Sequence, residues 1–373
     1  MKKKSNKTGY RKASRYELIR LLGAVSSLIW TVVLLVLLMI SGLSNAMAQV
    51  SYRYSDFWWQ AVVLYFVQFS IFFFILQEPL RWFLSYRIEK KYELSNLSLL
   101  GWIRDDLKKQ GLTFCFALLL VVCLYGLIRV FDSNWWISAW VVWVIISIFM
   151  GKILPVFIVP LFYKYEKIQD QELRQRLRLL VEKFNLKLED VYSLNLSKTT
   201  KKANAMFCGM GSTKRVVLTD NLLDQFDYEE IDSVVAHEVG HYVKKHLLKG
   251  LVLSGMESLI VFYSIFYLFD LLNTSLQIQT IAGVDSLPLI CLIAMVAGFL
   301  ISPLQKVMSR HMEREADAFS LSLIGKREAF IRAMQKLGEI NLANPSPNPI
   351  VEFMFYSHPS ISKRIRFAQR WST

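Results

Sequence analysis

A chain of 373 residues, of which 54% are hydrophobic and 14% aromatic, can bury a large soluble core or cross a membrane several times. Its formal net charge of +14 suits either a nucleic-acid-binding protein or a membrane protein, and the distribution of the charges separates these two classes. The four cysteines are scattered, so neither a disulfide framework nor a cysteine-ligated metal site is indicated.

Apolar runs dominate both halves of the chain. A helix needs about 20 apolar residues to cross the roughly 30 Å hydrocarbon layer of a bilayer. Six runs of this kind lie at 18–40, 57–83, 112–130, 136–162, 247–272 and 288–305. The first exceeds the apolar region of a secretion signal and has no convincing cleavage site behind it, so we expect it to be retained. The sequence therefore predicts a mainly α-helical, polytopic membrane protein with about six transmembrane helices.

Basic residues gather in alternate loops. Lys and Arg cluster in the segments 2–15, 87–109, 164–249 and 306–373. The intervening loops contain little besides Arg53, with Arg129 near one boundary. Cytoplasmic loops are enriched in Lys and Arg, so this alternation predicts that both termini face the cytoplasm. Because membrane topology accounts for the positive charge, we expect the lipid bilayer as a partner and no nucleic acid.

A soluble insert separates the fourth and fifth apolar runs. Residues 171–184 have the periodicity of an amphipathic helix. Three short apolar-rich segments bounded by turn residues predict small strands at 191–196, 203–208 and 215–219. The free side of an edge strand can hold an extended peptide through main-chain hydrogen bonds.

This organisation divides the chain into four segments. They are an N-terminal membrane region at 1–164, a soluble catalytic insert at 165–248, the last two membrane helices at 249–308 and a C-terminal segment at 309–373. The insert and the C-terminal segment would form a cytoplasmic α+β region.

The insert ends in a predicted helix with metal-binding spacing. Asp227 and Glu230 are spaced for a capping box at its start. His237 and His241 are one turn apart, so both imidazoles can bind the same metal ion, and Glu238 beside them can take a proton from a metal-bound water. Such pairs also occur on solvated helix faces, but all five histidines of this chain lie at or after His237. The pattern indicates a zinc peptidase helix.

The helix after the sixth apolar run offers a third ligand. His241 lies six residues before the fifth run and Glu313 eight residues after the sixth. If the two runs are antiparallel, a rise of 1.5 Å per residue places both groups roughly 9 to 12 Å beyond the same membrane boundary. Asp317 shares the face of Glu313 and would orient one ligand histidine. A charged surface helix is the alternative, and the matching depth favours a His-His-Glu metal site.

The chain resembles the integral-membrane zinc peptidases that include the type I CAAX prenyl proteases. The stretches that carry this resemblance are 158–162, 203–207, 214–223, 236–241 with His246, Glu313 with Asp317, and 356–360 with Arg364. Two features differ. We count six apolar runs where the eukaryotic prenyl proteases have seven spans, and Tyr92-Glu-Leu-Ser stands where they commonly have Gly-Phe-Asn.

The resemblance implies one zinc ion held by His237, His241 and Glu313, with Glu238 as the base. It also implies an intramembrane chamber roofed by the catalytic region.

Further positions carry roles implied by the same resemblance. Asn204 and Ala205 would lie near the substrate strand, and His358 and Arg364 would lie at the active site. His358 would stand beside the reacting carbonyl. Arg364, a permanent cation that can form two parallel bonds to a carboxylate, is a candidate for holding the free C-terminus of a substrate.

The expected function is that of a membrane-embedded zinc endopeptidase. Its substrate is a peptide or protein, and the sequence leaves open whether this is a C-terminal prenylated peptide or a misfolded membrane or secretory protein. A catalytically silent transporter or scaffold is the alternative from another class. The intact set around Glu238 argues against it, because a transporter has no need of a catalytic base.

Overall fold

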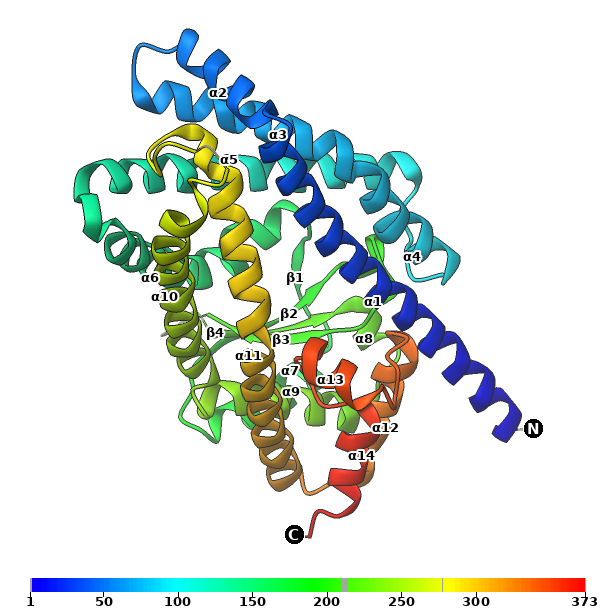
Figure 1. Cartoon of the computed structure of the whole chain (residues 1–373). Coiled ribbons are helices and arrows are strands. Elements are labelled where there is room, and N and C mark those ends of the chain that lie inside the picture. Colours follow the sequence, from blue (N-terminus) through cyan, green and yellow to red (C-terminus); the bar gives the residue numbers. More distant parts are fainter. Residues whose placement is uncertain (1, 210–213, 277, 373) are drawn as a thin grey trace.

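The computed structural model describes residues 2–209, 214–276 and 278–372. Long helices form one end of the molecule, and a small sheet surrounded by shorter helices forms the other (Figure 1). This arrangement agrees with the predicted helical membrane protein that carries an α+β region.

The N-terminal part consists of helices that pack side by side. They are α1 (Lys2–Ile40), α2 (Leu43–Arg53), α3 (Trp58–Trp82), α4 (Ile88–Lys91), α5 (Leu99–Phe131) and α6 (Trp135–Ile153). A 3-10 turn at Asp132–Asn134 joins α5 to α6, where the sequence predicts a tight connection. The two helices contact each other after this turn.

Five helical stretches among the described residues are long and apolar enough to cross a membrane. They are Gly9–Ile40, Trp58–Lys91, Leu99–Gly151, His246–Leu272 and Val284–Ile324. The third runs through α5, the 3-10 turn and α6, so it contains the third expected span and residues 136–151 of the fourth.

The last two long helices, α10 (His246–Leu272) and α11 (Leu287–Ile324), pack against each other. The sequence predicts the end of the sixth apolar run at Gln305, but α11 continues without a break to Ile324. Glu313 and Asp317 therefore belong to the same helix as the apolar run. The proposed division of the chain at 308–309 falls inside α11, and the four-segment division stays a prediction.

A four-stranded sheet forms the centre of the α+β region. Its strands are β1 (Tyr165–Lys167), β2 (Leu188–Leu194), β3 (Ala205–Cys208) and β4 (Lys214–Thr219), in the order β1-β2-β4-β3. The pair β2–β4 is parallel, and the other two pairs are antiparallel. The sequence missed β1, because three residues are too few to show strand alternation. The turn expected between β3 and β4 lies at 210–213, outside the described residues.

Helices cover this sheet and complete one apolar core. They are α7 (Gln171–Glu182), α8 (Asp220–Leu223), α9 (Tyr228–Val243), α12 (Arg327–Ile340) and α14 (Ile361–Gln369). The short helix α13 (Pro349–Phe355) packs against α11 instead. Leu177 of α7, Leu218 of β4 and Phe330 of α12 are buried in the same cluster as Val235 of α9. The helix that carries the histidine pair is thus held from several sides.

Both chain termini lie toward the end of the molecule that holds the sheet, and α2 lies at the opposite end (Figure 1). The same end carries α9 and the second half of α11. The termini and the histidine helix therefore share one side of the long-helix bundle.

Candidate metal centre

The histidine helix α9 begins as the sequence predicts. The backbone N–H of Glu230 donates to Asp227 Oδ1 at 2.9 Å, and the backbone N–H of Asp227 donates to Glu230 Oε2 at 2.9 Å. These reciprocal bonds satisfy two of the donors that a helix start leaves unpaired. The cap therefore fixes where α9 begins and, through it, which residues share a face.

Burial of α9 excludes the alternative of a solvated helix face. Val235, Ala236 and Val239 are fully buried, and His237 is only 6% exposed. Buried polar side chains require partners, because an unpaired polar group in the interior costs on the order of 1–3 kcal/mol. The question for His237 is therefore which groups it faces.

Helix α11 approaches α9 closely at Gly240. A Cβ at this position would lie 3.0 Å from Phe319 Cδ1 and 3.2 Å from Phe319 Cβ, so the glycine leaves room for the neighbouring helix. Two turns earlier on α9, the Ser320 hydroxyl donates to the Ser233 carbonyl at 2.7 Å. This contact brings the face of α11 that carries Glu313 against the histidines.

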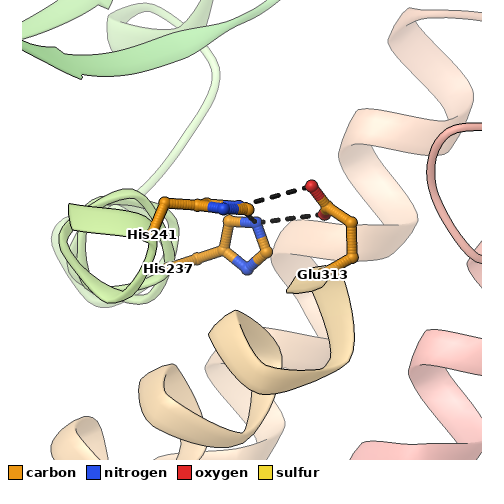
Figure 2. A group of neighbouring side chains, drawn as sticks. All are labelled: His237, His241 and Glu313. Atoms are coloured by element: carbon orange, nitrogen blue, oxygen red, sulfur yellow. Dashed lines mark hydrogen bonds and ion pairs between the residues drawn. The ribbon is translucent and has the colours of Figure 1, made fainter. Parts of the chain in front are cut away.

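Three donor atoms converge between the two helices (Figure 2). His237 Nε2 lies 3.1 Å from His241 Nε2, and each nitrogen lies 3.3 Å from an oxygen of Glu313. Two ligands held at 2.0–2.1 Å in a tetrahedron around one zinc ion lie about 3.3 Å apart. The three predicted ligands are therefore brought together with separations that fit a tetrahedral metal ion.

The carboxylate of Glu313 is incompletely satisfied by protein. Its Oε2 lies 3.3 Å from His237 Nε2 and 2.8 Å from His358 Nδ1, but it accepts no well-directed hydrogen bond among the described residues. Buried oxygens of this kind are rare unless a water or an ion completes their environment. Together with the nitrogen and oxygen donor set, this atom fits a bound metal cation.

Asp317 and Arg364 stand behind His237. His237 Nδ1 lies 2.9 Å from Asp317 Oδ1, and Arg364 donates to both carboxylate oxygens of Asp317, from Nε at 2.9 Å and from Nη2 at 2.5 Å. Because the carboxylate accepts from Nδ1, the Nε2 lone pair of His237 points into the site. Burial alone would lower the pKa of His237, but Asp317 and Glu313 raise it to about 9. The site is therefore anionic enough to favour a cation.

A second set of contacts lies behind His241. His241 Nδ1 is 2.9 Å from His246 Nδ1, and His246 Nε2 is 2.8 Å from Glu315 Oε2. The resemblance includes His246, but no feature of the local sequence marks Glu315 as its partner. The only available signal was their proximity in sequence to the predicted ligands: His246 follows His241 by five residues, and Glu315 follows Glu313 by two.

Glu238, the predicted base, is half-buried next to this centre. Its burial raises the pKa of its carboxyl group above the ordinary value. A carboxylate with a raised pKa is a stronger base, and catalytic bases work best when their pKa lies near the operating pH. The environment of Glu238 therefore suits proton transfer.

The predicted residue His358 lies at the rim of the centre, 61% exposed, with Nδ1 2.8 Å from Glu313. Arg310 of α11 donates to the carbonyls of Glu352 and Tyr356 at 2.8 and 2.6 Å, which caps the C-terminus of α13 just before His358. The buried Glu352 carboxylate accepts from the Ser360 backbone N–H at 3.2 Å. These contacts fix the turn that presents His358, and no local pattern predicts them, because Arg310 and Tyr356 are 46 residues apart.

Asn204 and Ala205 lie at the start of β3, an edge strand that pairs only with β4 among the described residues. Phe207 of β3 packs edge-on against Tyr242, with ring centroids 5.2 Å apart, so the strand lies next to the last turn of α9. The backbone of Asn204 is tied to Thr219 by hydrogen bonds of 3.0 Å in both directions. A fixed strand edge therefore runs beside the histidines.

The family model of peptidase family M48 matches residues 167–372, the part of the chain that contains this centre. The chain belongs to peptidase family M48. A second family model, described as the CAAX prenyl protease N-terminal part with five membrane helices, matches residues 1–164 of this M48 peptidase.

Individual proteins support the same assignment. The M48 peptidase is 32% identical over 296 residues to the uncharacterized metalloprotease YhfN of Bacillus subtilis, which covers 78% of this chain and 69% of the relative. It is 30% identical over 312 residues to CAAX prenyl protease 1 of Saccharomyces cerevisiae, which covers 77% and 67%. The crystal structure of S. mikatae Ste24p has the same fold, with a TM-score of 0.86 over 97% of this chain and 89% of that chain, at 21% identity.

These matches confirm the predicted class of enzyme. The M48 peptidase is a membrane-embedded metalloprotease that resembles the CAAX prenyl proteases, and its family membership implies a metal. The donor set at His237, His241 and Glu313 is the group among the described residues that can hold such an ion.

Proposed function

We propose that the M48 peptidase is a zinc-dependent endopeptidase whose single ion is held by His237, His241 and Glu313. The observation that carries the proposal is the convergence of the two imidazole Nε2 atoms, 3.1 Å apart, on the Glu313 carboxylate, which places one oxygen 3.3 Å from each nitrogen, beside the half-buried Glu238. A zinc ion bound there supplies Lewis-acid chemistry, because it polarises a carbonyl and lowers the pKa of water to about 7.

The remaining work belongs to residues of the chain. Glu238 begins as a carboxylate, accepts the proton of the attacking water and returns it to the leaving amine. His358, exposed at the rim, donates to the oxygen of the reacting carbonyl, where a single donor is typically worth about 3–4 kcal/mol of barrier. Asp317, itself held by Arg364, keeps the ring of His237 in one orientation.

The edge strand β3 provides the binding surface for the peptide. An extended substrate that pairs with the free edge of β3 at Ala205, next to Asn204, gains main-chain hydrogen bonds that do not depend on its side chains. Because β3 packs against the last turn of α9, a peptide on this edge passes beside Glu238 and His241. The Saccharomyces cerevisiae relative carries the name CAAX prenyl protease 1, which supports a substrate with a prenylated C-terminus. Misfolded membrane or secretory proteins are the alternative substrates.

The proposed orientation places the metal centre and both termini in the cytoplasm. Basic residues are concentrated in the segments that share one side of the long-helix bundle with α9, and such enrichment is typical of cytoplasmic loops.

The test compares metal content with hydrolysis in the purified chain. We expect Glu238→Gln to retain zinc and to lose peptide hydrolysis, because the base is not a ligand. His237→Ala and Glu313→Ala should lose both. Turnover at the wild-type rate in Glu238→Gln would refute the mechanism. Proteins that accumulate in membranes containing Glu238→Gln, relative to wild type, would identify the substrate class.

A further inference from the structure

His246 is a buried histidine that the proposed mechanism does not use. It is the first residue of α10 and is only 4% exposed. Lys245, which precedes it, adopts a left-handed conformation with a φ of 55°. A side chain other than that of glycine is uncommon in this conformation, because Cβ comes close to the following carbonyl oxygen. This turn returns the start of α10 to the last turn of α9, where His246 meets His241.

The contacts of His246 form a chain from the surface to the metal centre. Glu315 Oε2 lies 2.8 Å from His246 Nε2 and 3.0 Å from Lys249 Nζ. The other nitrogen of the ring, His246 Nδ1, lies 2.9 Å from His241 Nδ1. His241 Nε2 then faces Glu313 and His237.

When both imidazole rings are neutral, the hydrogen bonds that link Glu315, His246 and His241 can point in only one direction. The Glu315 carboxylate, paired with Lys249, accepts hydrogen bonds only, so His246 carries its proton on Nε2. Its Nδ1 then has a free lone pair and accepts from His241 Nδ1–H. His241 in turn keeps its Nε2 lone pair free, and this is the atom that faces the metal centre. A carboxylate at the surface thus sets which nitrogen of His241 can bind a metal.

We propose that His246 and Glu315 are positioning residues that fix the tautomer and ring orientation of His241 for metal binding. The inference rests on the proposed metal role of His241. Of the two ligand histidines, His241 is the more accessible: its side chain is 27% exposed, and that of His237 is 8% exposed. His237 is held directly by the buried Asp317, whereas His241 reaches its carboxylate through a second imidazole. Residues of this kind typically change metal affinity 10- to 100-fold when they are removed.

The experiment measures zinc affinity in the purified full-length chain, by competition with a chelator. We expect His246→Leu and Glu315→Ala to bind zinc 10- to 100-fold more weakly than wild type. Glu315→Gln keeps an acceptor for His246 Nε2–H and should restore most of the affinity. Saturating zinc should recover much of kcat/KM in each variant.

The control is His311→Ala, because His311 Nε2 lies 3.9 Å from the same Glu315 carboxylate but its side chain is 65% exposed and is not in the chain of contacts. We expect its zinc affinity to equal that of wild type. Thermal unfolding of the metal-free forms separates a local effect from a folding defect. Each variant should still unfold cooperatively, and Glu315→Ala should be less stable than Glu315→Gln, because alanine leaves the buried His246 Nε2–H without an acceptor.

The outcomes distinguish the two proposals. Wild-type zinc affinity in both His246→Leu and Glu315→Ala would overturn this inference and leave the proposed function intact. Equal losses in Glu315→Ala and Glu315→Gln would also overturn it, because the hydrogen-bond acceptor would then be irrelevant. A wild-type chain that binds no zinc would overturn the proposed function and this inference together.

Discussion

At the scale of single residues, the sequence identified the three predicted metal ligands but only some of the residues that orient them. The spacing of His237 and His241 and the depth of Glu313 were sufficient to bring three donors together, because helical geometry is set by local chemistry. The partners of these donors come from distant segments. Arg364 lies 47 residues from Asp317, and no local pattern reveals that contact.

Arg364 shows how tertiary contacts change a role. The sequence offered it as a clamp for the free C-terminus of a substrate. In the structure its guanidinium is buried, and two of its donors bind Asp317 behind His237. Removal of one member of a buried ion pair costs about 3–5 kcal/mol, because the other charge is left unpaired. The geometry therefore favours a positioning role.

We accordingly expect Arg364→Ala to lower kcat/KM about 10- to 100-fold by the same factor on matched peptides with free and with amidated C-termini. The measurement is kcat/KM for the two peptides, with Arg366→Ala, which alters an exposed residue of the same helix, as the control. A loss confined to the peptide with a free C-terminus would instead support the role of Arg364 in binding the substrate carboxylate.

At the scale of elements, apolar periodicity and capping signals predicted the helices well, and short elements poorly. The capping box at Asp227 and Glu230 located the start of α9, and the amphipathic pattern located α7. The strand β1 is defined by its pairing with β2 rather than by its own residues. The unbroken course of α11 was also missed, because a change from apolar to charged composition does not require a break in a helix.

The packing of α11 on α9 leads to a prediction at Gly240. In Gly240→Ala the new methyl group meets Phe319 at 3.0 to 3.2 Å, so α11 or the ring must shift. Overpacking of this kind costs about 1–3 kcal/mol, which exceeds the roughly 1 kcal/mol that alanine gains over glycine in a helix. Because the shift separates Glu313 from the histidines, we expect lower thermal stability and weaker zinc binding.

The matched control is Gly250→Ala in α10, where a Cβ meets no atom within 4 Å. We expect its melting temperature and zinc affinity to equal or exceed those of wild type. Gly240→Ala with wild-type values for both quantities would show that the close approach at this glycine does not position the site.

At the scale of the whole molecule, hydropathy predicted a membrane protein, and the family model and fold confirm that class. Two of the six expected spans, 112–130 and 136–162, meet in one helical stretch, Leu99–Gly151, because the three-residue 3-10 turn between α5 and α6 does not interrupt the helical course. The apolar pattern separates the two spans, and the helical backbone joins them. The orientation in the membrane depends instead on loop charge, which is a property of the entire chain.

That charge pattern gives a test of topology. Positive segments favour the cytoplasm, so the loop between α10 and α11 should face outward while both ends of the chain face inward. In a background without the four native cysteines, we introduce single cysteines at the exposed positions Arg11, Ser275 and Gln369. A membrane-impermeant thiol reagent should label Ser275→Cys on intact cells, and Arg11→Cys and Gln369→Cys only after permeabilisation. Helix α14 carries both Gln369 and Arg364, and Arg364 binds the Asp317 that contacts His237. Labelling of Gln369→Cys from outside would therefore place the metal centre on the outer face and reverse the proposed orientation.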